Sequence, residues 1–370
     1  MPNDSESVPD YSPVSRGQLI FRRFRRHRLG IAGTIILGIM YLLVIFAPFF
    51  APNDFLQHNP DYALAPPTRI HFADEEGFSF RPFIYGTKRA RDPVTLDVVF
   101  TEDRSERFPL YFFVRGSEYS LFGLKCSIHL FGIDQEADGV FFPIGADRFG
   151  RDLLARTLVG GRVSLSAGLL GVILSLIIGV IVGGVSGYYG GFIDAFVQRI
   201  IELLRSFPRL PLWLALSMVL PPQWSSVKVY FGVVTVLSLI GWTGQARVVR
   251  GQFLSLREKE FVQAARAIGV DDKGIIFRHI LPNTTSYLIV STTLALPGMI
   301  LGESSISFLG LGIKEPMTSW GLLLKDAQNL EALVLHPWLL FPGLFIILTV
   351  LAFNFMGDAV RDAFDPFSVR

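Results

Sequence analysis

The chain has 370 residues, of which half are hydrophobic and only 18% are charged, and its mean hydropathy is +0.43. This composition excludes intrinsic disorder, which requires low hydrophobicity and high net charge. It also excludes a disulfide-stabilised scaffold, because Cys126 is the only cysteine. The net charge of +2 gives no electrostatic argument for a polyanionic partner. A large soluble protein and a protein that crosses the membrane several times remain.

Six stretches are close to the length of about 20 apolar residues that a membrane-spanning helix needs. They cover residues 29–50, 163–187, 192–220, 229–246, 287–309 and 338–357. The first two contain no charged residue, whereas 192–220 carries charges in its first half. Buried helices of soluble proteins rarely run about 22 residues without a charge. We therefore predict an all-α polytopic membrane protein with six transmembrane helices.

Basic residues before the first span predict its orientation. Five arginines lie between Phe21 and Arg28, which places the N-terminus in the cytoplasm by the positive-inside rule. The apolar run that follows is too long for a cleaved signal peptide. Six crossings bring the C-terminus back to the cytoplasm. The predicted segments are a basic tail at 1–28 with a disordered start at 1–15, a first span at 29–50, a transmembrane core at 156–357 and a C-terminal tail at 358–370.

Four arginines oppose this orientation, because they precede the second span and are predicted to lie outside. They are Arg148, Arg151, Arg156 and Arg162. Asp147 and Asp152 neutralise part of their charge.

The stretch 51–155 is polar and carries 16 acidic against 11 basic residues, a net charge of −5. Structureless loops of this length are uncommon in compact proteins. Residues 95–100 and 109–114 have strand-like patterns, and 115–118 is typical of a turn. We predict a small extracytoplasmic insertion that contains β-structure; a partly disordered loop is the alternative.

The second span carries a small residue at every fourth position. The five positions are Gly171, Ser175, Gly179, Gly183 and Gly187. On a helix they form one ridge, which predicts close packing of a neighbouring helix. The alternative is that glycine is simply common in membrane helices. Residues 186–191 predict a tight turn.

The segment 247–283 returns to the cytoplasm and has a net charge of +3. Its pattern predicts two short helices. The first covers about 258–268 and ends at Gly269 in a left-handed conformation, and Asp271 or Asp272 caps the second. Pro282 lies near the start of the next span, where its missing N–H matters least. Ala264 and Ala265 predict a flat face that a partner can approach.

Three interpretations of this segment are open. A DNA-binding helix-turn-helix is disfavoured, because the segment is held between two spans and lacks a third helix. An amphipathic loop on the lipid headgroups is the second. A docking element for a cytoplasmic partner is the third, and we favour it.

This segment resembles the EAA loop of binding-protein-dependent ABC importer permeases. The family pattern is EAA, three residues, glycine, nine residues and Ile-x-Leu-Pro. The matching positions are Gln263, Ala264, Ala265, Gly269, Leu281 and Pro282. Gln263 replaces the usual glutamate and His279 the usual isoleucine, and both departures resemble the oligopeptide/dipeptide subfamily. The resemblance assigns ATPase coupling to this loop, including Glu260 and Asp271.

Further motifs of the subfamily occur in the same order along the chain. They lie at 144–165, 186–208, 303–312, 318–320 and 357–366. Ala146 stands where threonine is usual. The long acidic insertion departs from most family members, although one branch similar to cell-wall-peptide transporters carries a long connector. By position, the insertion could cover the pore mouth or dock a binding protein.

The resemblance implies a type I ABC importer permease that forms half of a pore for peptides, with nickel, glycosides or cell-wall fragments as other substrates of the family. The implied partners are a second homologous permease, two ATPase subunits, an extracytoplasmic substrate-binding protein and membrane lipid, but no nucleic acid. The location is the inner membrane of a bacterium. The chain has no phosphate-binding loop G-x-x-x-x-G-K-[ST], so ATP and Mg²⁺ belong to the partner subunits and no cofactor is expected on this chain.

Glu303 is an acidic residue predicted at membrane depth, which is a functional hypothesis by default. With Ser307 it could line or gate the translocation path. The alternative function is an ion-coupled secondary transporter with a proton relay through Glu303. The six histidines are scattered without metal-ligand spacing, so no metal and no catalytic residues are predicted.

Overall fold

The computed structural model describes residues 15–74, 77–91, 93, 98–134, 137 and 139–365. The tail predicted to be disordered lies outside the described residues except for Ser15. Ser15 caps the first short helix, because its side chain accepts a hydrogen bond from Gln18 N.

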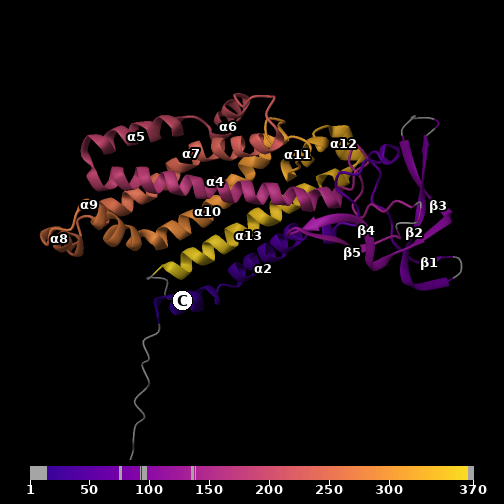
Figure 1. Ribbon diagram of the computed structural model, residues 1–370, viewed down its shortest axis with the longest axis horizontal. Helices are drawn as coiled ribbons and strands as arrows, with labels where there is room; N and C mark the ends of the chain where they lie inside the picture. Colours follow the sequence, from indigo (N-terminus) through magenta and orange to yellow (C-terminus); the bar gives the residue numbers. More distant parts are fainter. Residues whose placement is uncertain are drawn as a thin grey trace, which may run out of the picture.

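A bundle of long helices forms one end of the molecule and a small β-structure forms the other (Figure 1). Within the described ranges, five helical segments are long and apolar enough to cross a membrane. Their long helices are α2 (Arg28–Ile45), α4 (Leu153–Tyr189), α7 (Ser226–Leu256), α10 (Leu281–Phe308) and α13 (Phe341–Phe364). Their apolar side chains meet in one core around Leu37, Val172, Leu237, Ile300 and Phe353.

The third predicted span is wrong as a single helix. Residues 192–220 form two helices, α5 (Gly191–Ser206) and α6 (Arg209–Met218), separated at Phe207 and Pro208. Proline restricts the residue before it to extended conformations, and Phe207 has ψ 142° accordingly.

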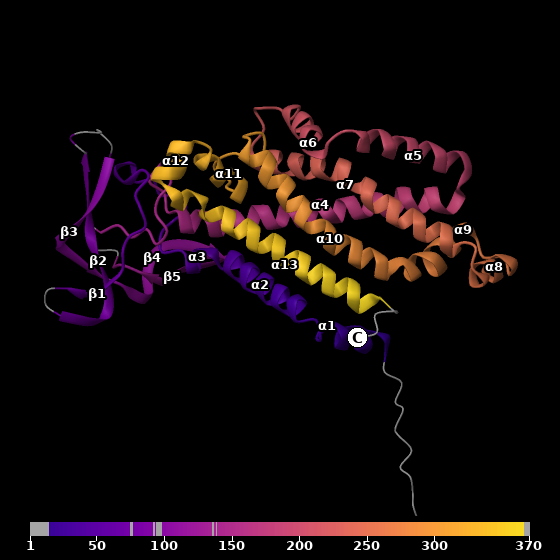
Figure 2. The same cartoon turned by 180° about the vertical axis from the view of Figure 1, so that it is seen from behind.

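The pair α5–α6 nevertheless carries the chain back along the bundle. Helices α4 and α7 run parallel, because Ser166 contacts Tyr230 near their starts and Gly187 lies against Phe253 near their ends. The connection between them therefore has to return over the length of the bundle. Figures 1 and 2 show α5 and α6 along one side of it.

Short helices connect these long elements. They are α1 (Arg16–Phe24), α3 (Ala47–Phe50), η1 (Pro60–Tyr62), α8 (Glu260–Ala267), α9 (Asp272–Gly274), η2 (Ile275–Ile280), α11 (Trp320–Leu324), η3 (Lys325–Ala327), α12 (Leu330–Leu335) and η4 (Pro337–Leu340). Helices α8 and α9 lie at the opposite end of the bundle from the strands (Figure 2). We call these the α8 end and the sheet end.

The inserted segment contains two antiparallel units. One is a three-stranded sheet of β1 (His71–Asp74), β2 (Gly77–Arg91) and β3 (Val98–Pro109), and the other is a hairpin of β4 (Tyr111–Leu121) and β5 (Leu124–Gly132). The predicted β-containing insertion is therefore confirmed. Of the first predicted strand, residues 95–97 lie outside the described residues and Val98 begins β3.

The turn predicted at 115–118 is wrong. These residues belong to β4, whose pairing with β5 shifts register between Arg115 and Tyr119. The chain instead reverses at Phe122 and Gly123, which have positive φ angles of 51° and 84°. Arg115 to Glu118 therefore contribute an irregular stretch inside the strand, where a polar sequence resembles a turn.

Candidate functional site

Helix α8 packs one face onto the bundle and exposes the other. Val262 is buried in a small apolar cluster with Phe253 of α7 and Ile275 of η2, and Ala265 is buried as well. Ala264 is exposed, as are Glu260 and Gln263. The prediction that Ala264 and Ala265 share a face for a partner is therefore wrong. They are consecutive residues, about 100° apart around a helix, and Ala265 points into its own chain.

The turn after α8 has the predicted geometry. Gly269 has a φ of +84°, which confirms the left-handed conformation, and its N–H donates to Arg266 O at 3.1 Å. Asp271 then caps α9, because its Oδ1 accepts from Gly274 N at 3.1 Å. A side chain longer than glycine is strained at this φ.

The second predicted short helix does not end before the next span. Helix α9 continues through the π-helical turn η2 into α10, which carries Pro282 in its first turn. Proline has no N–H and clashes with the preceding helical turn, so a wider turn here has a physical cause. His279 lies in η2 and Leu281 begins α10. The loop is therefore joined to a long helix without an intervening hinge.

Three polar contacts join residues of 247–283 to α4 and α5. The Tyr188 hydroxyl donates to Asp272 Oδ1 at 2.6 Å. Arg257 Nη1 donates to the carbonyls of Gly187 and Tyr188, both at 3.1 Å, and so caps the C-terminus of α4. Asp194 forms an ion pair with Arg250 at 2.5 Å. Sequence patterns did not identify these contacts.

The ridge of small residues on α4 lies largely at its contact with α7. A methyl group added at Gly179, Gly183 or Gly187 would overlap with Gln245, Ala246 or Phe253, respectively. Nearer the sheet end, Ser175 lies beside Gly241, and the carbonyl of Gly171 accepts from Ser238 Oγ at 3.2 Å. Small side chains at these positions therefore permit close approach of the two helix backbones.

A buried charge network at the sheet end was not predicted. Asp147 accepts from Arg151 Nε at 2.7 Å and from Arg156 Nη1. Glu315 accepts from both Arg151 Nη atoms at 2.9 and 3.0 Å and from Arg156 Nη2 at 2.8 Å. Arg151 and Arg156 are only 3% and 2% exposed. The network joins the segment before α4 to the segment before α11.

The network also explains the arginines that opposed the predicted orientation. Burial alone would raise the pKa of Asp147, but Arg156, Arg151 and backbone donors outweigh it and lower that pKa. Arg148 pairs with Asp326 at 3.2 Å. Arg162 donates to the carbonyls of Val44 and Ile45 at 2.9 and 2.8 Å. Each guanidinium group thus has a partner within the chain.

Asp152 begins α4 and gives a pH-dependent prediction. Its Oδ1 accepts a hydrogen bond from Leu154 N at 2.8 Å. Burial raises the pKa of Asp152 to about 6, although hydrogen bonds from Asn53 and from the helix N–H groups act to lower it. The folded state therefore binds this proton more tightly than the unfolded state, and the stabilisation decreases as pH rises through about 6. From pH 7 to pH 5, the free energy of unfolding should rise by about 1 kcal/mol relative to Asp152→Asn. Thermal unfolding of both proteins over this range checks it, and parallel pH profiles would contradict it.

Glu303 and Ser307 form a buried polar node between α10, α4 and α11. Ser164 Oγ donates to Glu303 Oε2 at 2.8 Å and Ser307 Oγ to Oε1 at 2.7 Å. Trp320 N in turn donates to Ser164 Oγ at 3.1 Å. Every hydrogen bond to the Glu303 carboxyl within the described ranges comes from a serine hydroxyl. This geometry fits an anchor inside the bundle.

Comparison with known proteins identifies the family. Residues 175–369 match the family described as "Binding-protein-dependent transport system inner membrane component". Residues 15–67 match "N-terminal TM domain of oligopeptide transport permease C". The chain belongs to this permease family. It is therefore a multi-pass inner membrane component of a binding-protein-dependent transport system, and its role is transport.

Relatives of the permease align over most of its length. The oligopeptide transport system permease protein OppC of Escherichia coli (strain K12) is 45% identical over 228 residues, which cover 60% of this chain and 71% of the relative. OppC of Bacillus subtilis is 32% identical over 93% of this chain and 87% of the relative. The dipeptide transport system permease protein DppC of Alkalihalophilus pseudofirmus is 31% identical, covering 99% and 94%. Alignments of 93% and 99% of the chain include the inserted segment.

Among solved structures, the inward-facing MetNI methionine ABC transporter is 20% identical to the permease. The superposed region covers 56% of this chain and 96% of the solved chain, with a TM-score of 0.44.

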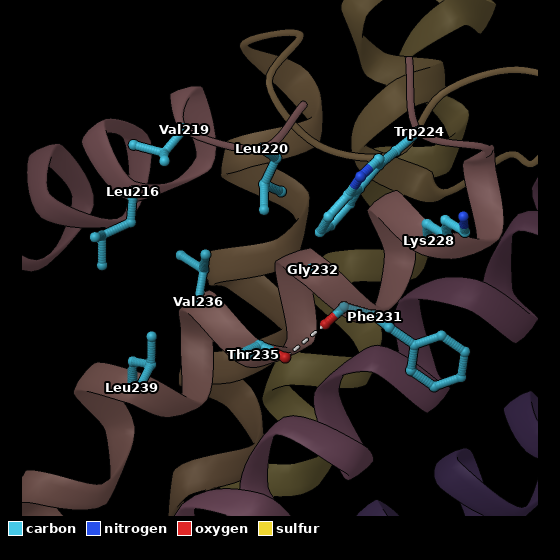
Figure 3. A pocket seen from close by; sticks show the side chains of 10 residues that line it. All are labelled: Leu216, Val219, Leu220, Trp224, Lys228, Phe231, Gly232, Thr235, Val236 and Leu239. Atoms are coloured by element: carbon cyan, nitrogen blue, oxygen red, sulfur yellow. Dashed lines mark hydrogen bonds between the residues drawn. The ribbon is translucent and has the colours of Figure 1, made fainter. Parts of the chain in front are cut away.

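The permease has an apolar groove of about 540 Å³ between α6 and α7 (Figure 3). Leu216, Leu220, Val236 and Leu239 line it, with Lys228 nearer the sheet end. The Thr235 hydroxyl is bonded to Phe231 O of its own helix at 2.8 Å. The walls therefore suit hydrocarbon rather than a peptide backbone. No cluster of three metal-ligating side chains occurs in the part of the chain that the structure describes.

Proposed function

We propose that the permease forms half of the translocation pore of an ATP-driven peptide importer. Several of its relatives are named oligopeptide or dipeptide transport permeases. The second half of the pore is a homologous permease, and an extracytoplasmic binding protein delivers the substrate. Two ATPase subunits bind ATP and Mg²⁺ and hydrolyse the nucleotide. This chain binds neither.

In the proposed orientation, the α8 end and both termini face the cytoplasm. Five arginines between Phe21 and Arg28 support it, since α1 and the start of α2 lie beside the end of α13. Arg23 Nη1 donates to Asp365 O at 2.7 Å, which joins the two terminal segments. The sheet end then faces outward, where the insertion can meet a binding protein.

The observation that carries the coupling role is the unbroken path from α8 to α10. Helix α8 contacts η2, where Val262 packs with Ile275, and η2 continues into α10. The exposed face of α8 carries Glu260, Gln263 and Ala264, together with exposed Ile268 beside the Gly269 turn. Closure of an ATPase pair against this face tilts α10 and shifts the pore between two states.

ATP dependence separates this function from the secondary transporter. Peptide uptake into cells or vesicles is measured with a protonophore and, separately, after ATP depletion. The importer keeps its uptake without a proton gradient and loses it without ATP. Loss of uptake with the protonophore at constant ATP would instead support ion coupling.

The two neighbouring alanines of α8 provide a matched test of docking. Ala264→Arg places a charge on the exposed face, so we expect copurification of the ATPase and ATP-driven uptake to fall at least about tenfold with unchanged thermal stability. Ala265→Arg buries a charge inside the chain and should lower the unfolding temperature of the permease itself.

Normal uptake and ATPase binding by a correctly inserted Ala264→Arg protein would contradict the docking face. Gly17→Arg, at an exposed position of α1 where an added methyl group meets no atom within 4 Å, measures the effect of added charge away from α8.

A further inference from the structure

A second cavity lies halfway along the bundle, between α6, α7 and α10. It has a volume of about 290 Å³ and combines apolar walls with polar side chains. The polar lining residues are Arg209, Thr243, Gln245 and Ser291, and the glycines are Gly241, Gly244 and Gly298. Unlike the apolar groove, this cavity therefore offers hydrogen-bonding groups at the depth of the membrane.

Two of its glycines are not required by packing within the chain. A methyl group added at Gly244 or Gly298 meets no atom within 4 Å, whereas one at Gly241 would overlap with Met299. Gly241 thus serves contact between α7 and α10. Gly244 and Gly298 leave free space and accessible backbone in the cavity, on two facing helices.

The polar groups of the cavity are only partly satisfied. Ser291 Oγ donates to Gln245 Oε1 at 2.8 Å, which links α10 to α7. Trp213 is 8% exposed, and its indole N–H has no acceptor among the described residues. An unpaired donor at membrane depth is costly, and Trp213 is one of the residues that line this cavity.

Positive charge gathers at the same place. Arg209 of α6 lines the cavity, Arg247 of α7 precedes the lining residue Val248, and Arg205 of α5 lies close enough to both arginines to be repelled by them. None of the three forms an ion pair within the described ranges. Arginine guanidinium groups bind carboxylates through two parallel hydrogen bonds. The cluster therefore lacks an anion that its chemistry would fit.

We propose that this cavity is a transit site for the peptide, in which Arg209, assisted by Arg205 and Arg247, holds the terminal carboxylate. The open space at Gly244 and Gly298 accommodates the adjoining backbone. A volume of about 290 Å³ suits the end of a peptide rather than a whole oligopeptide. This inference rests on the proposed peptide import. It places the site beside α10, the helix that continues from η2.

Cysteine accessibility tests whether the cavity belongs to an aqueous path. In the complete transporter carrying Cys126→Ser, Gly298→Cys is compared with Gly38→Cys. Gly38 is exposed on α2 and also has no atom within 4 Å of an added methyl group. We expect a charged, water-soluble thiol reagent to label Gly298→Cys at least about tenfold faster, because thiolates form in water. Binding protein loaded with a tripeptide should slow this labelling. Equal labelling at both positions, or no protection by the tripeptide, would overturn the inference.

Substrate chemistry tests the arginine. Uptake of a tripeptide with a free carboxylate is compared with that of its C-terminal amide, each at saturating loaded binding protein. We expect Arg209→Gln to reduce uptake of the free acid about tenfold and that of the amide less than twofold, with partial rescue by Arg209→Lys. Equal loss for both peptides, or no loss, would overturn carboxylate recognition.

Two further outcomes identify other causes. If the defect of Arg209→Gln appears only in vesicles with anionic lipid, the arginine binds a lipid phosphate and the inference fails. If the wild-type transporter imports neither peptide with ATP, the proposed function fails as well. If the wild-type transporter imports both peptides and the Arg209 variants affect the two peptides equally, only this inference fails.

Discussion

Asp147→Ala should lower the free energy of unfolding of the permease by about 3–5 kcal/mol, because it removes one partner of a buried ion network. Asp147 is fully buried and accepts from two arginines that are themselves almost fully buried. Without it, Arg151 and Arg156 share only Glu315, whose side chain is 42% exposed. Thermal unfolding of the purified protein at pH 7 measures the loss.

Arg89→Ala is the control, since it breaks an ion pair with Asp61 in which both side chains are exposed, at the same end of the molecule. Such pairs contribute about 1 kcal/mol or less. Adding Arg156→Met to Asp147→Ala should restore part of the stability, because it removes one unpaired charge. A loss in Asp147→Ala no larger than in the control would show that the network is not stabilising.

Gly269→Pro should abolish ATP-driven uptake, by roughly 100-fold or more, while insertion into the membrane continues. Proline fixes φ near −65°, whereas Gly269 has a φ of +84°. It also removes the N–H that donates to Arg266 O. The turn would open and α8 would lose its position on η2. Uptake and the amount of permease in the membrane are measured together.

Two other glycine variants make this test specific. Gly269→Asn should retain most uptake, because asparagine tolerates the left-handed region. Gly251→Ala on α7 should have little effect, since an added methyl group there meets no atom within 4 Å and φ is ordinary. Normal uptake by Gly269→Pro at wild-type membrane levels would show that coupling does not require this turn.

Long apolar runs predicted most of the bundle, because membrane-spanning helices are specified by composition over about 20 residues. The third crossing was predicted as one helix, although Pro208 marked the break between α5 and α6. The apolar second half of 192–220 concealed this break. The irregular stretch at Arg115 to Glu118 was misassigned because a turn and a strand irregularity favour the same polar residues.

The hydrogen bonds of the turn after α8 could be predicted, since Gly269 and Asp271 bond to backbone atoms only three residues away. Burial of Ala265 could not, because it depends on how α8 packs against the rest of the chain. The charge network was also beyond sequence patterns. Arg156 and Glu315 are separated by 159 residues, and nothing in the chain between them indicates that they meet.

The π-helical turn η2 has a consequence for how movement passes along the chain. Each residue added to or removed from an α-helix turns its faces by about 100°. A π-helical turn contains the equivalent of one extra residue. If this turn moves along the helix, the helical segment before it rotates relative to the segment after it, and the backbone stays helical throughout. Helix α9, and α8 before it in the chain, can therefore change angular phase relative to α10. In the proposed coupling, rotation as well as tilt would then pass through a single continuous helix.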